Sequence, residues 1–126
     1  YPNVDANNSK ILSDISKFKP NKNFYMIRHM PLEGFVHAMC HARCMIGNSS
    51  AGIREIASFG VPAVNIGDRQ VGRERNSNVI DTSSEYDSIV SAIKEGMSKS
   101  YDKLNLYYIP NGSKKIVQEI IKFIDK

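Results

Sequence analysis

The stretch Cys44-Met45-Ile46-Gly47-Asn48-Ser49-Ser50-Ala51-Gly52 decides the predicted fold of this chain. Its first three residues form the short apolar run of a buried strand, and the small polar residues that follow are typical of a turn. A helix is expected over 51–59, ended by Gly60, and a second apolar run at 61–66 predicts the next buried strand. A strand, a tight turn, a helix and another strand form the repeating unit of an α/β sheet.

Outward from this unit, the alternation of strands and helices continues toward both ends of the chain. No repeat or low-complexity linker interrupts it. The sequence therefore predicts an α/β domain with a parallel sheet, and we expect the last helix to cover one face of that sheet. The further helices are expected at 9–18, 31–42, 86–97 and 116–124, and the further strands at 23–28 and 79–81.

Length and composition are those of one globular domain. Of the 126 residues, 41% are hydrophobic and 24% are charged, which disfavours disorder, collagen-like repeats and coiled coils. We expect residues 1–126 to form a single domain. Because the chain begins with Tyr1 rather than Met, we also expect it to be a fragment of a longer protein.

Charge and cysteine content limit the partners and the compartment. The net charge of +4 is spread along the chain between acidic residues, so no nucleic-acid partner is indicated. No apolar run approaches the roughly 18 residues of a membrane helix, and no secretory signal is present. Cys40 and Cys44 are too few for a disulfide framework. Together these features predict a soluble, cytoplasmic protein with no membrane partner.

The Gly47–Gly52 turn is the first candidate binding site. Small residues let the backbone approach a ligand closely, and the hydroxyls of Ser49 and Ser50 can donate hydrogen bonds. The unpaired N–H groups of the following helix would favour an anion at this end of the sheet. On spacing alone, it is equally plausible that one of the serines only caps the helix. The turn has neither the lysine of a P-loop nor the spacing of a dinucleotide fingerprint.

Glu55 follows Ser50 by slightly more than one helical turn, so its carboxylate can reach a ligand at the helix terminus. A carboxylate beside phosphates is useful if it accepts hydrogen bonds from hydroxyls, as those of a ribose. The alternative is an ordinary surface charge paired with Arg54 or another basic neighbour.

The loop over 67–78 follows the next strand and is expected to lie over the same crevice. It carries Arg69, Arg73 and Arg75, whose planar guanidinium groups suit a diphosphate. Solvated surface charge explains any one of them equally well, and only their placement beside the serines favours a binding role.

A row of metal-ligand side chains marks the predicted 31–42 helix. His37, Cys40, His41 and Cys44 recur at i, i+3, i+4 and i+7. One helix face cannot surround an ion tetrahedrally, and Cys44 belongs to the following strand. We therefore expect a half-buried helix face and no metal site.

Four segments of the sequence carry a likeness to a known family. They are Tyr1-Pro2-Asn3-Val4-Asp5, Arg28-His29-Met30-Pro31, residues 45–55 and residues 59–73. Over nearly the whole chain they resemble the C-terminal domain of UDP-N-acetylglucosamine 2-epimerases. The motif Gly-Asn-Ser-Ser-x-Gly-Ile-Arg-Glu, followed by Gly-Asp-Arg-Gln-x-Gly-Arg, is similar to the hydrolysing, sialic-acid-pathway branch. Non-hydrolysing relatives usually show Ser-Gly-Gly and Gln-Glu at these places.

The resemblance implies a Rossmann-like, three-layer domain that forms the C-terminal half of a two-domain GT-B-type enzyme. The nucleotide sugar would lie in the cleft between the halves, so the implied partners are a UDP-sugar and an N-terminal domain of the same enzyme. A homo-oligomer is compatible with this arrangement. By matching motif, Ser49 and Ser50 would bind the diphosphate, Glu55 the ribose hydroxyls, and Arg69 would lie near the phosphates.

Two further roles rest on the resemblance alone. The backbone around Met30 would meet the uracil edge, and Asn3 would close the far wall of the site. The UDP site expected from motif and basic loop together comprises Asn3, Met30, Ser49, Ser50, Glu55, Arg69 and Arg73.

The resemblance also implies a reaction. UDP leaves by anti elimination across the sugar C1–C2 bond, and water then adds to the glycal to give N-acetylmannosamine and free UDP, without a metal or redox cofactor. The proton-transferring groups belong to the N-terminal half and the inter-domain region, so no catalytic residue is assigned here and the fragment alone is expected to be inactive. Its contribution would be stabilisation of the leaving diphosphate.

Two other functions stay open at this point. A GT-B glycosyltransferase would share every physical argument about the crevice, and it would release UDP only when a sugar acceptor is present. A non-catalytic α/β binding domain is the other alternative, although the polar, basic crevice argues against it.

Overall fold

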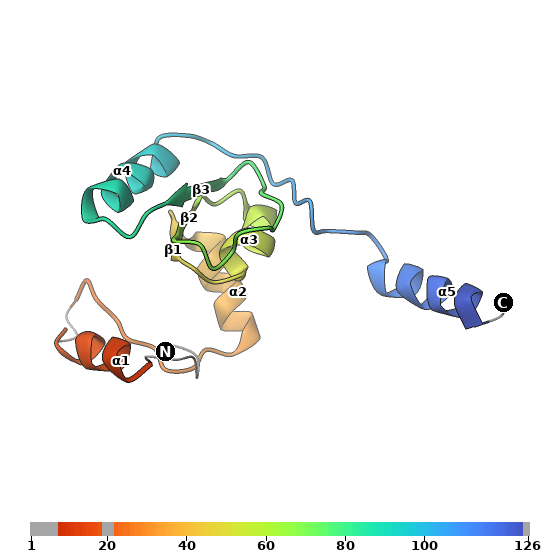
Figure 1. Ribbon diagram of the computed structural model, residues 1–126, viewed down its shortest axis with the longest axis horizontal. Helices are drawn as coiled ribbons and strands as arrows, with labels where there is room; N and C mark the ends of the chain where they lie inside the picture. The colour runs from red at the N-terminus through yellow and green to blue at the C-terminus, as the bar shows by residue number, and fades with distance from the viewer. Residues whose placement is uncertain (1–7, 19–21, 125–126) are drawn as a thin grey trace. The chain divides into compact units, whose positions relative to one another are not determined.

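The computed structural model describes residues 8–18 and 22–124. The chain divides into two compact units, one within Tyr1–Val36 and one within His37–Lys126. Helix α1 (Asn8–Ser16) belongs to the first unit, and helix α2 (Leu32–His41) contains the boundary between the units. The remaining helices belong to the second unit (Figure 1); they are α3 (Ala51–Arg54), the 3-10 helix η1 (Ile56–Phe59), α4 (Tyr86–Met97) and α5 (Gly112–Ile124).

Parallel strands form the sheet of the second unit. They are β1 (Met45–Gly47), β2 (Ala63–Ile66) and β3 (Val79–Thr82), in the order β1-β2-β3. Met45 lies opposite Ala63, and Ala63 lies opposite Val79. Because the strands run in the same direction, their carboxyl ends lie at one edge of the sheet. The prediction of an α/β domain with a parallel sheet is confirmed.

Helices cover both faces of this sheet. Gly52 of α3 lies against Ala63, where an added Cβ would be 3.7 Å from the Ala63 Cβ. Gly96 of α4 lies against Ile80, which is the register partner of Val64. Since successive residues of a strand point to opposite faces, Ala63 and Val64 mark the two sides of β2. The structure therefore has the three layers, Rossmann-like in arrangement, that the resemblance implies.

The segment between β1 and β2 departs from the single helix that the sequence predicts, because it forms α3 and then η1. Asparagines from distant segments explain the change. Asn76 Nδ2 donates to the carbonyl oxygen of Ile53 at 2.9 Å, and Asn105 Nδ2 donates to that of Arg54 at 2.7 Å. In a continuous α-helix these oxygens would accept bonds from residues four positions later. Ile53 of α3 and Ile56 of η1 are both fully buried.

The predicted strand over 23–28 is wrong. This segment contains only an isolated bridge residue, Phe24, and the structure leaves Tyr25, Met26 and Ile27 exposed. The alternation of side chains suits a strand, but a strand exists only where its backbone pairs with a neighbour. The side-chain pattern carries no information on that neighbour.

The α5 helix presents an exposed apolar face. None of its residues is buried, so the packing on the sheet that the sequence suggests is not observed. The face consists of Ile116, Val117, Ile120, Ile121 and Ile124, each of them exposed. In the part of the chain that the structure describes, no helix combines the length and the apolar character needed to cross a membrane.

Candidate functional site

The serine turn, defined here as Gly47–Ser50, connects the carboxyl end of β1 to α3. Gly47 has φ +144°, a backbone conformation that L side chains rarely adopt, so glycine allows the chain to turn directly after the strand. Ser49 Oγ accepts a hydrogen bond from the N–H of Ala51 at 3.3 Å. Ser50 occupies the N-cap position of α3, but its hydroxyl makes no capping bond. A capping role thus fits Ser49 and does not fit Ser50.

Backbone donors at the serine turn are fewer than a regular helix terminus would provide. The N–H of Gly52 already donates to the Ser49 carbonyl at 3.1 Å, and that of Ala51 is taken by the Ser49 hydroxyl. The N–H groups of Ser49 and Ser50 have no acceptor within residues 8–18 and 22–124. Because α3 has only four residues, its dipole adds less than a long helix would. The groups of the turn that can still donate hydrogen bonds are therefore the serine hydroxyls and these two amides.

The loop over 67–78 lies beside the serine turn, as the sequence predicts. Gln70 Nε2 donates to the carbonyl oxygen of Asn48 at 2.7 Å, and Gln70 is buried. This bond connects residues that are 22 positions apart. Arg69 and Arg73 are exposed on the loop that it anchors.

Arg75 differs from the other arginines of the loop, because its guanidinium is occupied within the fold. Its Nε is 2.9 Å from Asp81 Oδ2, and its Nη2 is 3.1 Å from Asp81 Oδ1. Its Nη1 donates to the carbonyl oxygens of Gln70 at 2.9 Å and of Arg73 at 2.7 Å. The expectation that Arg75 faces a diphosphate is therefore corrected: it holds the loop against the end of β3.

Asp81 joins this ion pair to the interior of the site. The Arg75 guanidinium holds the pKa of the Asp81 carboxyl below its ordinary value, and a hydrogen bond from Asn65 lowers it further against the opposing effect of burial. Asn65 Nδ2 donates to Asp81 Oδ1 at 2.6 Å. Arg75, Asp81 and Asn65 thus form a continuous chain from the basic loop to β2.

Lowering the pH is expected to remove the contribution of Asp81 to stability. Its folded-state pKa is depressed, so the stabilisation is fully present above the unfolded-state pKa of about 3.9 and is lost as the pH falls through the folded-state value. Urea unfolding between about pH 7 and pH 2 should show a smaller loss for Asp81→Asn than for the parent chain. Asp102→Asn is the control, because Asp102 is exposed and has no ion pair in the described ranges. Equal losses in the parent and Asp81→Asn would contradict this assignment.

Glu55 lies at the carboxyl end of α3, where its backbone N–H donates to the Ala51 carbonyl. Its side chain is exposed and forms no ion pair with any described residue. The Arg54 guanidinium instead lies over the Tyr107 ring, 5.9 Å from the ring centroid. The alternative in which Arg54 neutralises Glu55 is therefore not observed.

Some predicted site residues cannot be placed beside the serine turn. Asn3 lies outside the described residues. Met30 is half-buried in the first unit, where its Cγ would be 3.1 Å from a Cβ added at Gly34. The roles of Asn3 and Met30 at a uracil stay predictions.

The expected half-buried helix face is not observed: His37, Cys40 and His41 of α2 are all exposed, and of the four side chains only Cys44 is partly buried. The buried residue of α2 is Met39. The His37 and His41 rings lie 4.2 Å apart between centroids, and His41 Nδ1 contacts the His37 carbonyl oxygen at 2.8 Å. Partial burial raises the pKa of the Cys44 thiol. Among the described residues, no group of three or more His, Cys, Asp or Glu side chains is placed to hold a metal ion.

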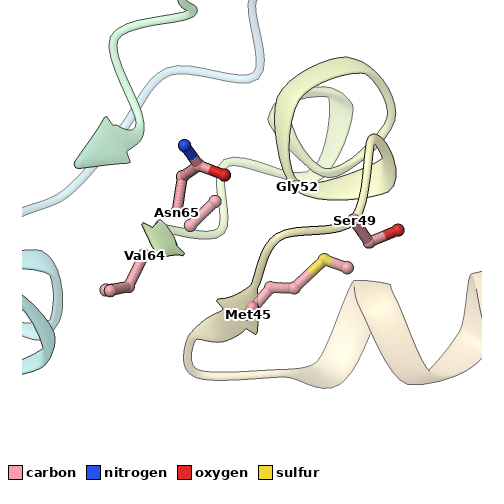
Figure 2. Close-up of a pocket in the computed structure, with 7 residues that line it drawn as sticks. Met45, Ser49, Gly52, Val64 and Asn65 are labelled. Atoms are coloured by element: carbon pink, nitrogen blue, oxygen red, sulfur yellow. The ribbon is translucent and has the colours of Figure 1, made fainter. Parts of the chain in front are cut away.

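Sequence reasoning missed the residues that assemble the site, Asn65, Gln70 and Asp81. Asn65 carried a signal, because an amide in the middle of the apolar run Ala63-Val64-Asn65-Ile66 must find a buried partner. Figure 2 shows Asn65 in a small cavity that it shares with Met45, Ser49, Gly52 and Val64.

Comparisons with known proteins bear on this site. A family model described as UDP-N-acetylglucosamine 2-epimerase matches residues 1–122. A UDP-N,N'-diacetylbacillosamine 2-epimerase (hydrolyzing) of Legionella pneumophila is 32% identical over 123 residues, which are 98% of this chain and 33% of that protein. A UDP-N-acetylglucosamine 2-epimerase of Neisseria meningitidis is 38% identical over 98 residues, which are 78% of this chain and 26% of that protein.

A third relative gives the same picture. A GDP/UDP-N,N'-diacetylbacillosamine 2-epimerase (hydrolyzing) of Campylobacter jejuni is 35% identical over 102 residues, 79% of this chain and 26% of that protein. The chain thus spans between a quarter and a third of the length of these relatives. The match covers both the serine turn and the basic loop. The chain belongs to the UDP-N-acetylglucosamine 2-epimerase family.

Proposed function

We propose that this chain binds the UDP part of a UDP-N-acetylhexosamine, as one part of a hydrolysing 2-epimerase. The observation that carries the proposal is the hydrogen bond from Gln70 to the Asn48 carbonyl, which holds a basic loop beside the serine turn. Donors without acceptors and arginines thereby share one edge of the sheet, where α/β folds bind anionic ligands. The names of the relatives support a UDP-linked amino sugar.

The diphosphate would bind at the serine turn. The N–H groups of Ser49 and Ser50 and the free hydroxyl of Ser50 supply donors, while Arg69 and Arg73 supply charge. Negative charge accumulates on the departing UDP during an elimination. Hydrogen-bond donors and arginines placed at the diphosphate would stabilise that charge and so the leaving group. Glu55, exposed at the end of α3, would accept hydrogen bonds from the ribose. No proton-transferring residue of the reaction is assigned to this chain.

Titration with UDP, followed by the backbone amide signals of 49–55 and Met30, tests the proposal. We expect saturable shifts with UDP that AMP and inorganic phosphate do not reproduce. If the chain alone shows no shifts at millimolar UDP, the same titration is made on the full-length protein that contains it. Absence of UDP binding in both would overturn the proposal.

Ser50→Ala sharpens this test. A hydrogen bond to a charged group contributes about 1.5–3 kcal/mol, so we expect UDP affinity to fall about tenfold or more. Ser88→Ala is the matched control, because Ser88 is an exposed serine of α4 without a hydrogen bond in the described structure. Unchanged UDP affinity in Ser50→Ala would place the phosphates elsewhere.

A further inference from the structure

A small cavity lies behind the serine turn, between β1, β2 and α3. Its volume is about 10 Å³, and its lining consists of backbone and small side chains together with Met45 and Asn65. Asn65 is only 3% exposed. In Figure 2 the side-chain oxygen of Asn65 lies on the side of Gly52, and its nitrogen is turned away from it.

The chemistry of Asp81 fixes this orientation of the amide. Asp81 accepts hydrogen bonds from Arg75, and its pKa is lowered, so at neutral pH its carboxylate is an acceptor only. The group of Asn65 that faces it at 2.6 Å must therefore be the NH2 group. Asn65 Oδ1 is left on the cavity side, where it has no hydrogen-bond partner among the described residues.

A buried acceptor without a hydrogen-bond donor lowers the stability of a protein by about 1–3 kcal/mol. A donor inside the cavity would therefore be bound favourably by Asn65 Oδ1. A phosphate oxygen does not answer this need, because it is itself an acceptor and a phosphate is far larger than 10 Å³. A cavity of roughly 10–15 Å³ is large enough for one water molecule. Ser49 also lines the cavity, but in Figure 2 its hydroxyl points away from Asn65, so the polar side-chain atom that a water would meet here is Asn65 Oδ1.

We infer that Asn65 is a positioning residue that holds one ordered water molecule behind the serine turn. The water donates one hydrogen to Asn65 Oδ1, and its second hydrogen is available to a phosphate oxygen bound at the turn. The water thus accounts for how an amide oxygen, which only accepts hydrogen bonds, could help to bind an anion: the water donates one hydrogen to the oxygen and the other to the anion. The role of this water in ligand binding rests on the proposed binding of UDP. The presence of the water in the cavity does not depend on that proposal.

The first test is a high-resolution crystal structure of the chain without ligand. We expect an ordered water within hydrogen-bonding distance of Asn65 Oδ1. An empty cavity, or a refined amide with its nitrogen on the cavity side, would overturn the inference. This result is independent of whether the protein binds UDP.

The second test compares the affinities of UDP and uridine in the parent, in Asn65→Leu and in Asn78→Leu, using the same form of the protein that binds UDP. Leucine matches the branched shape of asparagine and removes the acceptor. Since a water-mediated bond is nearly as strong as a direct one, we expect Asn65→Leu to lower the ratio of UDP to uridine affinity by about five- to tenfold, with uridine binding unchanged.

Asn78→Leu is a matched control for burial. Asn78 is 1% exposed, donates Nδ2 to the Val61 carbonyl at the other end of the sheet, and likewise has an unpartnered Oδ1. It does not line the cavity, so it should leave the ratio unchanged. If the leucine variant of Asn65 does not fold, Asn65→Ala replaces it.

The outcomes separate the two proposals. If the parent binds UDP and the Asn65 variant keeps its preference for UDP over uridine, the positioning role fails and UDP binding stands. If both asparagine variants lose the preference equally, the effect is general destabilisation and the positioning role fails. If the parent itself shows no preference for UDP, the proposed function fails and the water is judged from the crystal structure alone.

Discussion

Gly60→Ala is expected to lower the free energy of unfolding by about 3 kcal/mol or more. Gly60 ends η1 in the left-handed conformation, with φ +68° and ψ 25°, which costs an L residue about 1–2 kcal/mol. An added Cβ would also lie 2.7 Å from the carbonyl oxygen of Tyr101, a backbone atom that a rotamer change cannot move. Urea unfolding followed by circular dichroism measures the loss.

Gly67→Ala separates the two causes. Gly67 has φ +74°, but an added Cβ would meet no heavy atom within 4 Å. We expect this variant to lose only the conformational cost of about 1–2 kcal/mol. Equal losses at Gly60 and Gly67 would mean that the segment at Tyr101 moves aside freely, and the steric part of the argument would be wrong.

Arg75→Ala is expected to destabilise the chain by about 2–3 kcal/mol and to release the basic loop. The substitution removes the ion pair with Asp81 and the bonds to the carbonyls of Gln70 and Arg73, and charge-assisted bonds are worth more than neutral ones. Arg75→Lys should restore only part of the loss, because an ammonium cannot reproduce the planar fork. Denaturant unfolding and amide hydrogen exchange over 70–75 are the measurements.

Arg73→Ala is the control for Arg75. Its side chain is exposed, and only its backbone takes part in the network, through its carbonyl oxygen and through its N–H, which donates to the Gln70 carbonyl at 3.4 Å. Stability and exchange over 70–75 should therefore stay near those of the parent. If Arg75→Ala leaves hydrogen exchange unchanged, the loop is held by Gln70 alone. If Arg73→Ala destabilises as strongly as Arg75→Ala, the effect reflects the charge of the loop rather than the specific bonds.

The predictable part of the fold is the part that depends on neighbouring residues. The apolar run before Gly47, the glycine at residue 60 and the helical period after Tyr86 place β1, the end of η1 and α4 close to where the structure has them. The break between α3 and η1 could not be predicted, because it depends on Asn76 and Asn105. Nothing near the helix in sequence indicates those bonds.

Prediction of the site is limited in the same way. The spacing of the serines and the position of the loop after β2 are local features, and they correctly place the loop beside the turn. Sequence treats Arg69, Arg73 and Arg75 alike, and only the contact with Asp81 shows that Arg75 has a structural task. Asn65 could be suspected from its apolar neighbours, but the direction of its amide depends on Asp81, 16 residues later.

The bond from Asn105 to the carbonyl of Arg54 can form only some time after Arg54 has been synthesised. The two residues are 51 positions apart, and a ribosome adds about 5–20 residues per second, so the partner of Arg54 is synthesised roughly 3–10 s after Arg54 itself. During that interval the helical turn preceding Glu55 has an unsatisfied end. Strands β1 to β3 and the serine turn are translated before Asn105, so the turn that precedes Glu55 gains this partner only after the segments of the sheet have been made.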